Sequence, residues 1–379
     1  MTHIRIVLTF FASIFFVSCS DDESDMTNII SDYIIFSHHY DSVPINPCKL
    51  SSHELNDKNS ILFEHDVFLQ DLSFTTEFEP ATDEPLIIEA GKTDGFIRIE
   101  GATINLYKFH SSNGIKLNEC INLITPLAKG IRYKIGFHKT LYGVKFFLKG
   151  ENLDFERWYD IDEDFMQNRL SGNPFFTIES GSVTVYKSVL SSDYKENAKV
   201  MVIGDSFIEG MASIQYGYPI NSRWCAQLAE AITPNNCIID GRGGEVVCDQ
   251  WFKRLELECS WFSPEYTIIS MGTNNYSRVD EYKIYMRQAI DLLKTKGIKP
   301  ILVTVTPRYE IADSPSPSEI NEWIKNSGEL YIDINKAIIN PENPSKWKNG
   351  FILPDGIHPT VEGYKAMFER LKEDCPFLF

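Results

Sequence analysis

Basic residues are scarce in this chain of 379 residues, with 36 Lys and Arg against 53 Asp and Glu and a formal net charge of −17. This balance excludes nucleic acid as a partner, because phosphate binding needs a basic surface. The eight cysteines include no C-x-x-C pair, which argues against a metal site or a thioredoxin-like motif. The sequence also lacks an apolar run of about 18 residues, the length typical of a transmembrane helix.

The N-terminal segment has the pattern of an export signal. Arg5 precedes the apolar run 6–17, which has the length of a signal-peptide core. Ser18 and Cys19 resemble a bacterial lipobox, which implies that Cys19 becomes the lipidated first residue of an exported, outer-membrane or cell-surface lipoprotein. We expect a signal peptide over 1–19 and an acidic tether over 20–30, with an ordinary cleaved signal as the alternative. The other seven cysteines are an odd number, so at least one stays free.

The remaining chain has two different sequence patterns, and its length also suggests two domains. Residues 31–192 contain short runs of β-branched and aromatic residues separated by Gly, Asn, Asp and Pro, which predicts an all-β sandwich or jelly roll. These runs lie at 86–90, 95–109, 131–137, 144–148 and 182–190.

Residues 197–379 alternate strands with helices, which predicts an α/β domain with a parallel sheet and helices on both faces. The expected strands are 200–203, 237–240, 266–270, 299–307 and 330–334, and the expected helices are 221–232, 280–297 and 360–374.

Polar residues follow several of these strands. Ser206 comes directly after the apolar strand 200–203, at the carboxyl end where α/β sheets bind ligands. A serine there can be a nucleophile, which needs a base, a residue that orients the base, and oxyanion donors. It can also be the N-cap of the next helix.

The other parts of such a site lie elsewhere in the sequence. The glycine-rich stretch 241–245 and Asn274 follow two further strands and can donate to an oxyanion, although each is also typical of an ordinary turn. Asp355 and His358 are three positions apart, close enough for the carboxylate to orient the imidazole. His358 stands before Pro359, so a surface turn is its alternative role.

Taken in order, these four segments resemble the conserved blocks of the SGNH (GDSL-type) hydrolases, over about the second half of the chain. The resemblance implies a carboxylic ester hydrolase that needs no metal or cofactor, with Ser206 as nucleophile, His358 as base and Asp355 as its orienting carboxylate. It also implies an oxyanion hole formed by the Ser206 N–H, the Gly244 N–H and the Asn274 side chain. Gly243 competes with Gly244, because the second block has an extra glycine. Asp240 and Asn275 stand where the family commonly has Asn and Asp.

A β-sandwich before such a domain resembles the layout of some carbohydrate esterases that remove acetyl groups from polysaccharides. We therefore expect short acyl esters, chiefly acetyl, on an extracellular polysaccharide or oligosaccharide as the substrate. The alternatives are a lipid esterase, a cell-wall O-acyltransferase and a non-catalytic glycan-binding surface lipoprotein. Residues near the same sheet edge are candidates for the substrate pocket or, equally, for an ordinary surface: Arg242, Glu245, Trp251, Tyr276 and Arg308.

Overall fold

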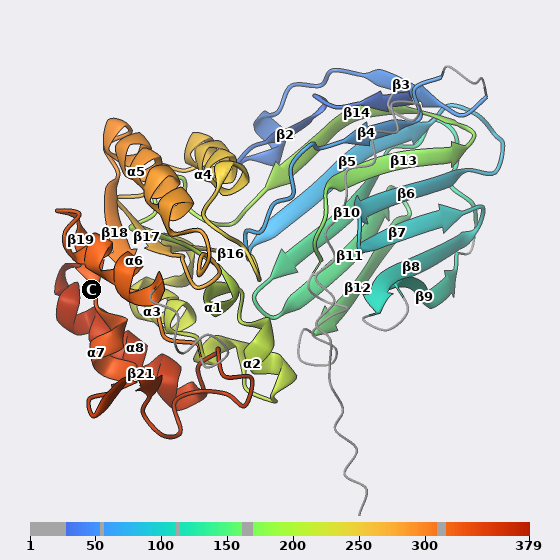
Figure 1. Ribbon diagram of the computed structural model, residues 1–379. Helices are drawn as coiled ribbons and strands as arrows, with labels where there is room; N and C mark the ends of the chain where they lie inside the picture. Colours follow the sequence, from blue (N-terminus) through green and yellow to red (C-terminus); the bar gives the residue numbers. More distant parts are fainter. Residues whose placement is uncertain (1–27, 54–56, 111–113, 124, 161–169, 309–315) are drawn as a thin grey trace, which may run out of the picture.

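The structure is a computed structural model that describes residues 28–379 except 54–56, 111–113, 124, 161–169 and 309–315 (Figure 1). The expected signal peptide, Cys19 and most of the expected tether lie outside the described residues. The first strand, β1 (Ile29–Ile30), pairs in parallel with β4 (Ser60–Leu62), so the β structure begins just inside the range expected for the tether.

Two sheets build the N-terminal β region, residues 29–191. The first has the order β1-β4-β13-β6-β7-β8-β9, in which the strands not yet given are β6 (Ile87–Lys92), β7 (Gly95–Glu100), β8 (Thr103–His110), β9 (Gly114–Asn122) and β13 (Pro174–Ser180). The second has the order β12-β11-β10-β5-β14-β2, with β3 also paired to β14. Its strands are β2 (Ile34–Phe36), β3 (Cys48–Ser51), β5 (Leu72–Pro80), β10 (Tyr133–Thr140), β11 (Gly143–Gly150), β12 (Leu153–Asp160) and β14 (Ser182–Ser191).

The alternation of side chains explains why these segments form half-buried strands. In β7 the buried residues Ile97 and Ile99 alternate with more exposed neighbours, because successive side chains of a strand point to opposite faces. Apolar side chains from both sheets form one core cluster. The run 95–109, expected as one strand region, is divided into β7 and β8 by a turn at Gly101, whose φ of +56° lies in the left-handed region that favours glycine.

A parallel five-stranded sheet forms the centre of the C-terminal α/β region, with the order β16-β15-β17-β18-β19. Its strands are β15 (Val200–Gly204), β16 (Cys237–Gly241), β17 (Tyr266–Ser270), β18 (Lys299–Val303) and β19 (Leu330–Ile332). The helices are α1 (Ser206–Glu209), α2 (Met211–Gln215), α3 (Trp224–Ile232), α4 (Asp249–Trp261), α5 (Val279–Thr295), α6 (Ser316–Lys325), α7 (Ile334–Ile338) and α8 (Val361–Asp374). A short hairpin of β20 (Ile339–Asn340) and β21 (Asn343–Trp347) precedes α8.

Helices cover both faces of this sheet, which makes three layers (Figure 1). One core joins Val200 and Val202 to α3, α7 and α8, and the other joins Ile203 and Leu302 to α4, α5 and α6. Every residue of β15 is buried for this reason. The fold class predicted from the sequence is confirmed: the C-terminal part is α/β with a parallel sheet, and the N-terminal part consists predominantly of β-strands.

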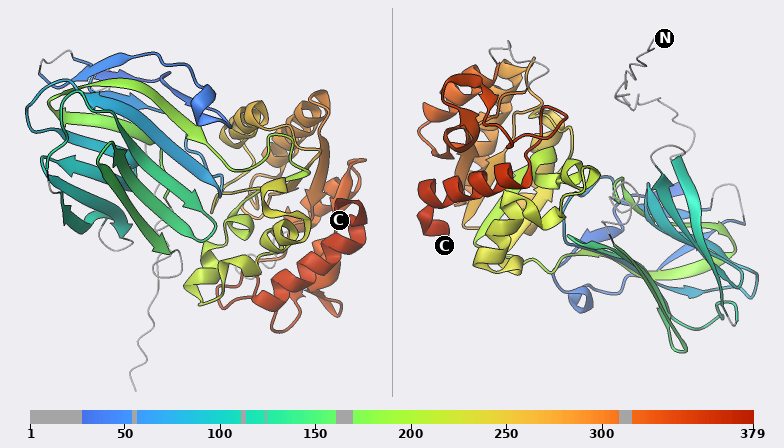
Figure 2. Two further views of the ribbon diagram at one scale, coloured as in Figure 1. Left: turned by 180° about the vertical axis from the view of Figure 1, so that it is seen from behind. Right: turned by 90° about the horizontal axis from the view of Figure 1, so that it is seen from below.

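The two regions lie side by side in both views of Figure 2. The turn between β10 and β11 approaches helix α3, and a hollow of about 280 Å³ there is lined by Thr140 and Tyr142 from the β region and by Ala226 and Ala229 from α3. Met201 of β15 packs in the same cluster as the core of the β region. The regions therefore share apolar contacts as well as the connector 192–199.

Candidate active site

Ser206 lies where strand β15 ends and helix α1 begins. The N-cap of this helix is Asp205, whose Oδ1 accepts a hydrogen bond from the Phe207 N–H at 3.1 Å. Burial raises the pKa of Asp205 to about 6. The alternative in which Ser206 caps the helix is therefore wrong, because Asp205 has that position and Ser206 is the first helical residue.

His358 connects Ser206 to Asp355. The imidazole Nε2 lies 2.7 Å from Ser206 Oγ, and Nδ1 lies 2.7 Å from Asp355 Oδ2. When Nδ1–H donates to the carboxylate, Nε2 is left as the acceptor for the serine proton. The structure thus brings into contact the three residues that the sequence proposes as nucleophile, base and orienting acid.

A tight turn holds Asp355 in this position. Asp355 Oδ1 accepts hydrogen bonds from the Ile357 N–H at 2.9 Å and the His358 N–H at 3.0 Å, while Oδ2 faces the imidazole. Burial disfavours the ionised carboxyl, but the hydrogen bonds from the His358 ring and from these two N–H groups outweigh it and lower the pKa of Asp355. Asp355 is therefore a carboxylate at neutral pH, as an orienting residue must be.

The loop after β16 is fixed against the strand that leads to Ser206. The Arg242 N–H donates to the Gly204 carbonyl at 3.0 Å. Gly244 has a φ of +76°, in the left-handed region that favours glycine, and it comes directly before Glu245, whose N–H closes the turn onto the Arg242 carbonyl at 3.2 Å. Of the two candidate glycines, Gly243 and Gly244, the second thus holds the special backbone conformation.

Asn274 and Asn275 join the loop after β17 to the loop after β16. Asn274 Nδ2 donates to the Glu245 carbonyl at 3.0 Å. An amide NH₂ has two hydrogens, so this bond fixes the side chain and leaves the second N–H for an oxyanion. The buried Asn275 accepts from the Val247 N–H at 3.0 Å and donates to the Val247 carbonyl at 3.1 Å. Asn275 stands where the family commonly has Asp, and its two hydrogen bonds connect the two loops.

The residues considered for the substrate pocket have different environments. The Arg242 side chain is 43 % exposed. Arg308 Nη1 donates to the Thr273 carbonyl at 3.4 Å, and its guanidinium lies 5.2 Å from the ring of the exposed Tyr276. Trp251 is fully buried in the core shared with α5, so its role is structural.

Glu245 also points inward, where it contacts a buried arginine, Arg254. A second arginine, Arg223, is buried below α1 and donates to the Glu209 carbonyl at 3.0 Å. Sequence reasoning missed both arginines. The signal that could have indicated them is the presence of a cation among the apolar positions of α4 and at the start of α3.

Elsewhere in the part of the chain that the structure describes, ligand atoms of Asp71, His138 and Asp193 lie within 4.8 Å of one another. Asp71 Oδ1 already accepts from the Ser192 hydroxyl at 3.1 Å and from the Asp193 N–H at 2.7 Å. All seven cysteines from Cys48 to Cys375 have free thiols. Within the described ranges, no helix combines the length and apolarity needed to cross a membrane.

Comparison with known proteins finds a family model that is similar to the part of the chain that holds this site. Residues 202–366, somewhat less than half of the chain, match the model of the GDSL-like Lipase/Acylhydrolase family. No curated protein matches the chain.

Several solved structures are similar to about half of this chain. A GDSL-like lipase from Bacteroides thetaiotaomicron is 21% identical, with a TM-score of 0.38 over 48% of this chain and 88% of its own. A member of the lipolytic protein G-D-S-L family from Veillonella parvula is 19% identical, with a TM-score of 0.39 over 47% of this chain and 97% of its own. A catalytic mutant of an acetylxylan esterase from Geobacillus stearothermophilus is 16% identical, with a TM-score of 0.35 over 48% of this chain and 95% of its own.

Proposed function

We propose that this protein is a serine esterase that hydrolyses short acyl esters, chiefly acetyl, on extracellular carbohydrate. The observation that carries the esterase chemistry is the continuous contact from Ser206 through His358 to Asp355, with 2.7 Å at each step. A serine hydroxyl is a weak nucleophile, and a neighbouring base of this kind is what activates it.

The reaction follows from this geometry. Ser206 Oγ attacks the ester carbonyl while its proton passes to His358 Nε2, and Asp355 stabilises the imidazolium. The negative oxygen is held by the Ser206 and Gly244 N–H groups and by Asn274 Nδ2. The Ser206 N–H is suited to this task because the first N–H groups of a helix have no partner within the helix. His358 then protonates the leaving alcohol, and water releases the acyl group by the same steps.

Three observations support a short acyl group on a carbohydrate. The N-terminal pattern predicts export, so the chain meets extracellular polymers. A lipase gains about 0.8 kcal/mol for each buried methylene, and the sequence shows no long apolar lid for that purpose. A β region precedes the hydrolase domain, as in the carbohydrate esterases that the sequence resembles.

A chain-length series decides between the candidate substrates. We expect para-nitrophenyl acetate to be the best of a series of aryl esters, and acetylated xylan or mannan to release acetate. A preference that rises steadily toward long acyl chains, without acetate from any glycan, would leave a lipid esterase. Transfer of the acyl group to a sugar hydroxyl instead of water would leave an O-acyltransferase. Glycan binding without any ester hydrolysis would show that the protein is a non-catalytic glycan-binding protein.

In the same proposal the protein is anchored in a membrane through lipids on Cys19. Two or more acyl chains are enough for stable anchoring. The wild-type protein should therefore fractionate with membranes when expressed with its own N-terminus, and Cys19→Ala should not. Recovery of the wild type entirely as a soluble secreted protein would contradict the anchor and leave the esterase chemistry untouched.

A further inference from the structure

A short segment of the β region, Phe68–Gln70, pairs with the edge strand of the α/β region. Leu69 forms an antiparallel bridge with Asp240 of β16, and the Gln70 N–H donates to the Ile239 carbonyl at 2.9 Å. Strand β16 is an edge of the parallel sheet, so this segment satisfies backbone groups that an edge otherwise exposes. The next residue of β16, Gly241, begins the loop that carries Gly244.

Phe68 packs between cations of both regions. Its ring is buried, and the centroid lies 5.6 Å from Lys92 Nζ of the β region. On the side of the α/β region, the guanidinium of Arg242 lies 4.8 Å from the centroid and that of Arg254 lies 5.7 Å from it. A cation within about 6 Å of an aromatic ring is attracted to its face, so the ring favours one placement of these arginines.

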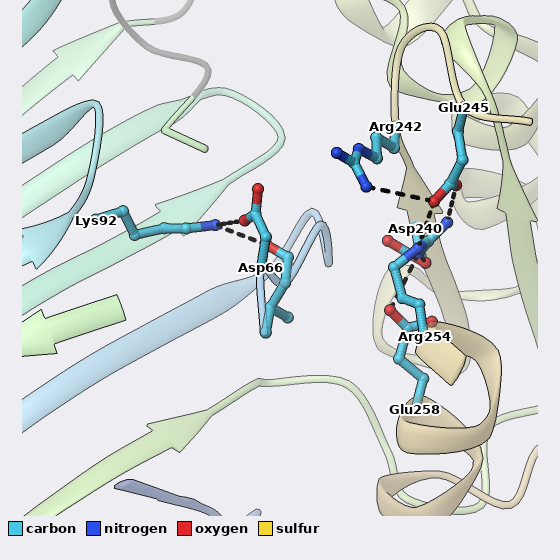
Figure 3. A network of polar contacts seen from close by, with 8 residues as sticks. Asp66, Lys92, Asp240, Arg242, Glu245, Arg254 and Glu258 are labelled. Atoms are coloured by element: carbon cyan, nitrogen blue, oxygen red, sulfur yellow. Dashed lines mark hydrogen bonds and ion pairs between the residues drawn. The ribbon is translucent and has the colours of Figure 1, made fainter. Parts of the chain in front are cut away.

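Arg254 connects this ring to the oxyanion loop. Figure 3 shows its guanidinium surrounded by Asp240, Glu245 and Glu258, and shows Lys92 of the β region paired separately with Asp66. Arg254 Nε donates to Glu245 Oε1 at 3.1 Å, and Nη1 lies 3.1 Å from Glu258 Oε1. Two hydrogen bonds from the Arg254 guanidinium, from Nε to Oε1 and from Nη2 to Oε2, therefore hold the Glu245 side chain in one position. The Glu245 carbonyl in turn accepts the hydrogen bond from Asn274 Nδ2.

Gln70 reaches the nucleophile by a separate route. Its Oε1 accepts a hydrogen bond from Arg223 Nη2 at 3.1 Å. The fully buried Arg223 also donates to the carbonyls of Ile208 and Glu209, the last two residues of α1. A helix as short as α1 is marginal by itself, so contacts of this kind determine where Ser206 lies.

We propose that Phe68 and Gln70, which belong to the β region, are positioning residues of the ester-cleaving site. Phe68 fixes the oxyanion loop through Arg254 and Glu245, and Gln70 fixes the nucleophile helix through Arg223. The β region is therefore part of the catalytic apparatus in addition to any role in binding carbohydrate. This inference rests on the proposed esterase function.

The test uses the full chain and para-nitrophenyl acetate. Gln70→Leu keeps the size of the side chain and removes the acceptor for Arg223, whereas Gln70→Glu keeps an acceptor. We expect Gln70→Leu to lower kcat on the order of tenfold with KM changed less than about twofold, and Gln70→Glu to restore most of kcat, because the contact acts on the transition state and not on substrate binding. Equal loss in both variants would overturn the role of the acceptor.

Phe68→Leu has a matched control in Phe176→Leu, which changes another buried phenylalanine of the β region. We expect Phe68→Leu to lower kcat on the order of tenfold, and Phe176→Leu to lower thermal stability while kcat at 25 °C is retained. If both lower kcat alike, or if neither does, the positioning role is wrong. If Phe68→Leu does not fold, the pair at Gln70 decides the question. Absence of any hydrolysis by the wild type would instead contradict the proposed function itself.

Discussion

Two clusters of ion pairs, one around Arg98 in the β region and one around Arg254 in the α/β region, differ in how far solvent reaches them. In the β region, Arg98 pairs with Glu89 and Glu179 on the side of a sheet that solvent reaches, and the Glu179 side chain is 45 % exposed. In the α/β region, Arg254 and its three carboxylate partners are all at most 7 % exposed. An antiparallel sheet can leave one face to water, whereas a parallel sheet covered by helices cannot.

This difference explains where the chemistry lies. The residues of the candidate site gather at the strand ends of the α/β region, where Gly204, Gly241 and Ser270 lead into loops. Single changes at these ends should therefore remove activity without unfolding the protein. Single changes inside either core should instead destabilise the fold while the catalytic groups stay intact.

Ser206→Ala should have the largest effect on activity of all the changes at the strand ends. It should lower ester hydrolysis a thousandfold or more, because the nucleophile is lost, while the unfolding midpoint stays near that of the wild type. The measurement is kcat on para-nitrophenyl acetate beside a thermal melt. Ser260→Ala, at an exposed serine of α4, is the matched control and should change neither. Turnover near the wild-type level in Ser206→Ala would show that another group is the nucleophile.

Asp355→Asn should have the next largest effect, a loss on the order of a few hundredfold in kcat. The amide no longer stabilises the imidazolium and can favour the wrong tautomer of His358. Asp291→Asn, at an exposed position of α5, serves as the control. An unchanged rate in Asp355→Asn would mean that a different group orients His358.

Asn274→Ala should lower kcat on the order of a hundredfold, the usual consequence of removing one oxyanion donor. KM should change little, because the donor acts mainly when the negative oxygen has formed. Asn326→Ala is a suitable control, since its amide also donates to a backbone carbonyl but lies at an exposed position directly after α6. Retention of full kcat in Asn274→Ala would limit the oxyanion hole to backbone N–H groups.

Truncation of buried side chains tests the expectation that changes inside the two cores lower stability. Ile97→Ala in β7 and Ile268→Ala in β17 each remove a fully buried side chain, and each should cost about 2–5 kcal/mol of unfolding free energy. Because Met201 joins the core of the β region, we expect both variants to shift one common transition in calorimetry. Two separate transitions, with only one shifted by each variant, would show that the regions unfold independently.

The smallest effect concerns pH and the buried carboxylates around Arg254. Burial raises the pKa of Glu258 to about 7, above that of an exposed glutamate. A carboxyl whose pKa is raised by folding stabilises the folded state at low pH, and this contribution is lost as the pH rises through about 7. Glu258→Gln removes the titration, so its Tm relative to the wild type should increase between pH 5 and pH 8, by about 2–4 °C.

Glu256→Gln, at an exposed position of the same helix, provides the control for this measurement. A Tm difference between Glu258→Gln and the wild type that is independent of pH would show that Glu258 keeps its charge state across this range.

Local pattern was enough to predict most of the fold. The run Val200–Ile203 is apolar at every position because both faces of β15 are covered, and it was assigned correctly as a buried strand. Strand β18 ends at Val303, short of the expected 299–307, because its pairing with β19 ends at Ile332. Helix α4 was missed, since its buried positions include the charged residues Arg254 and Glu258 and so break the apolar pattern.

The candidate site was predictable where its residues follow strands in a recognisable order. Ser206 and Asn274 were found in this way, whereas Asp355 and His358 were found from their spacing and their place in the order of the family blocks. Phe68 and Gln70 could not be found, because their importance comes from arginines that contact them only in the folded protein. Asp205 was not identified as the cap of α1, although its position before Ser206 suits that role.

The contact between Gln70 and Arg223 joins residues that are 153 positions apart in the sequence. During synthesis the β region emerges first, and its segment Phe68–Gln70 has no partner until strand β16 and helix α3 have formed. Contacts between such distant parts of a chain form slowly, because loop closure costs entropy before the contact repays it. Ester-cleaving activity should therefore appear late in refolding, after the β-strand signal of the first region has already recovered.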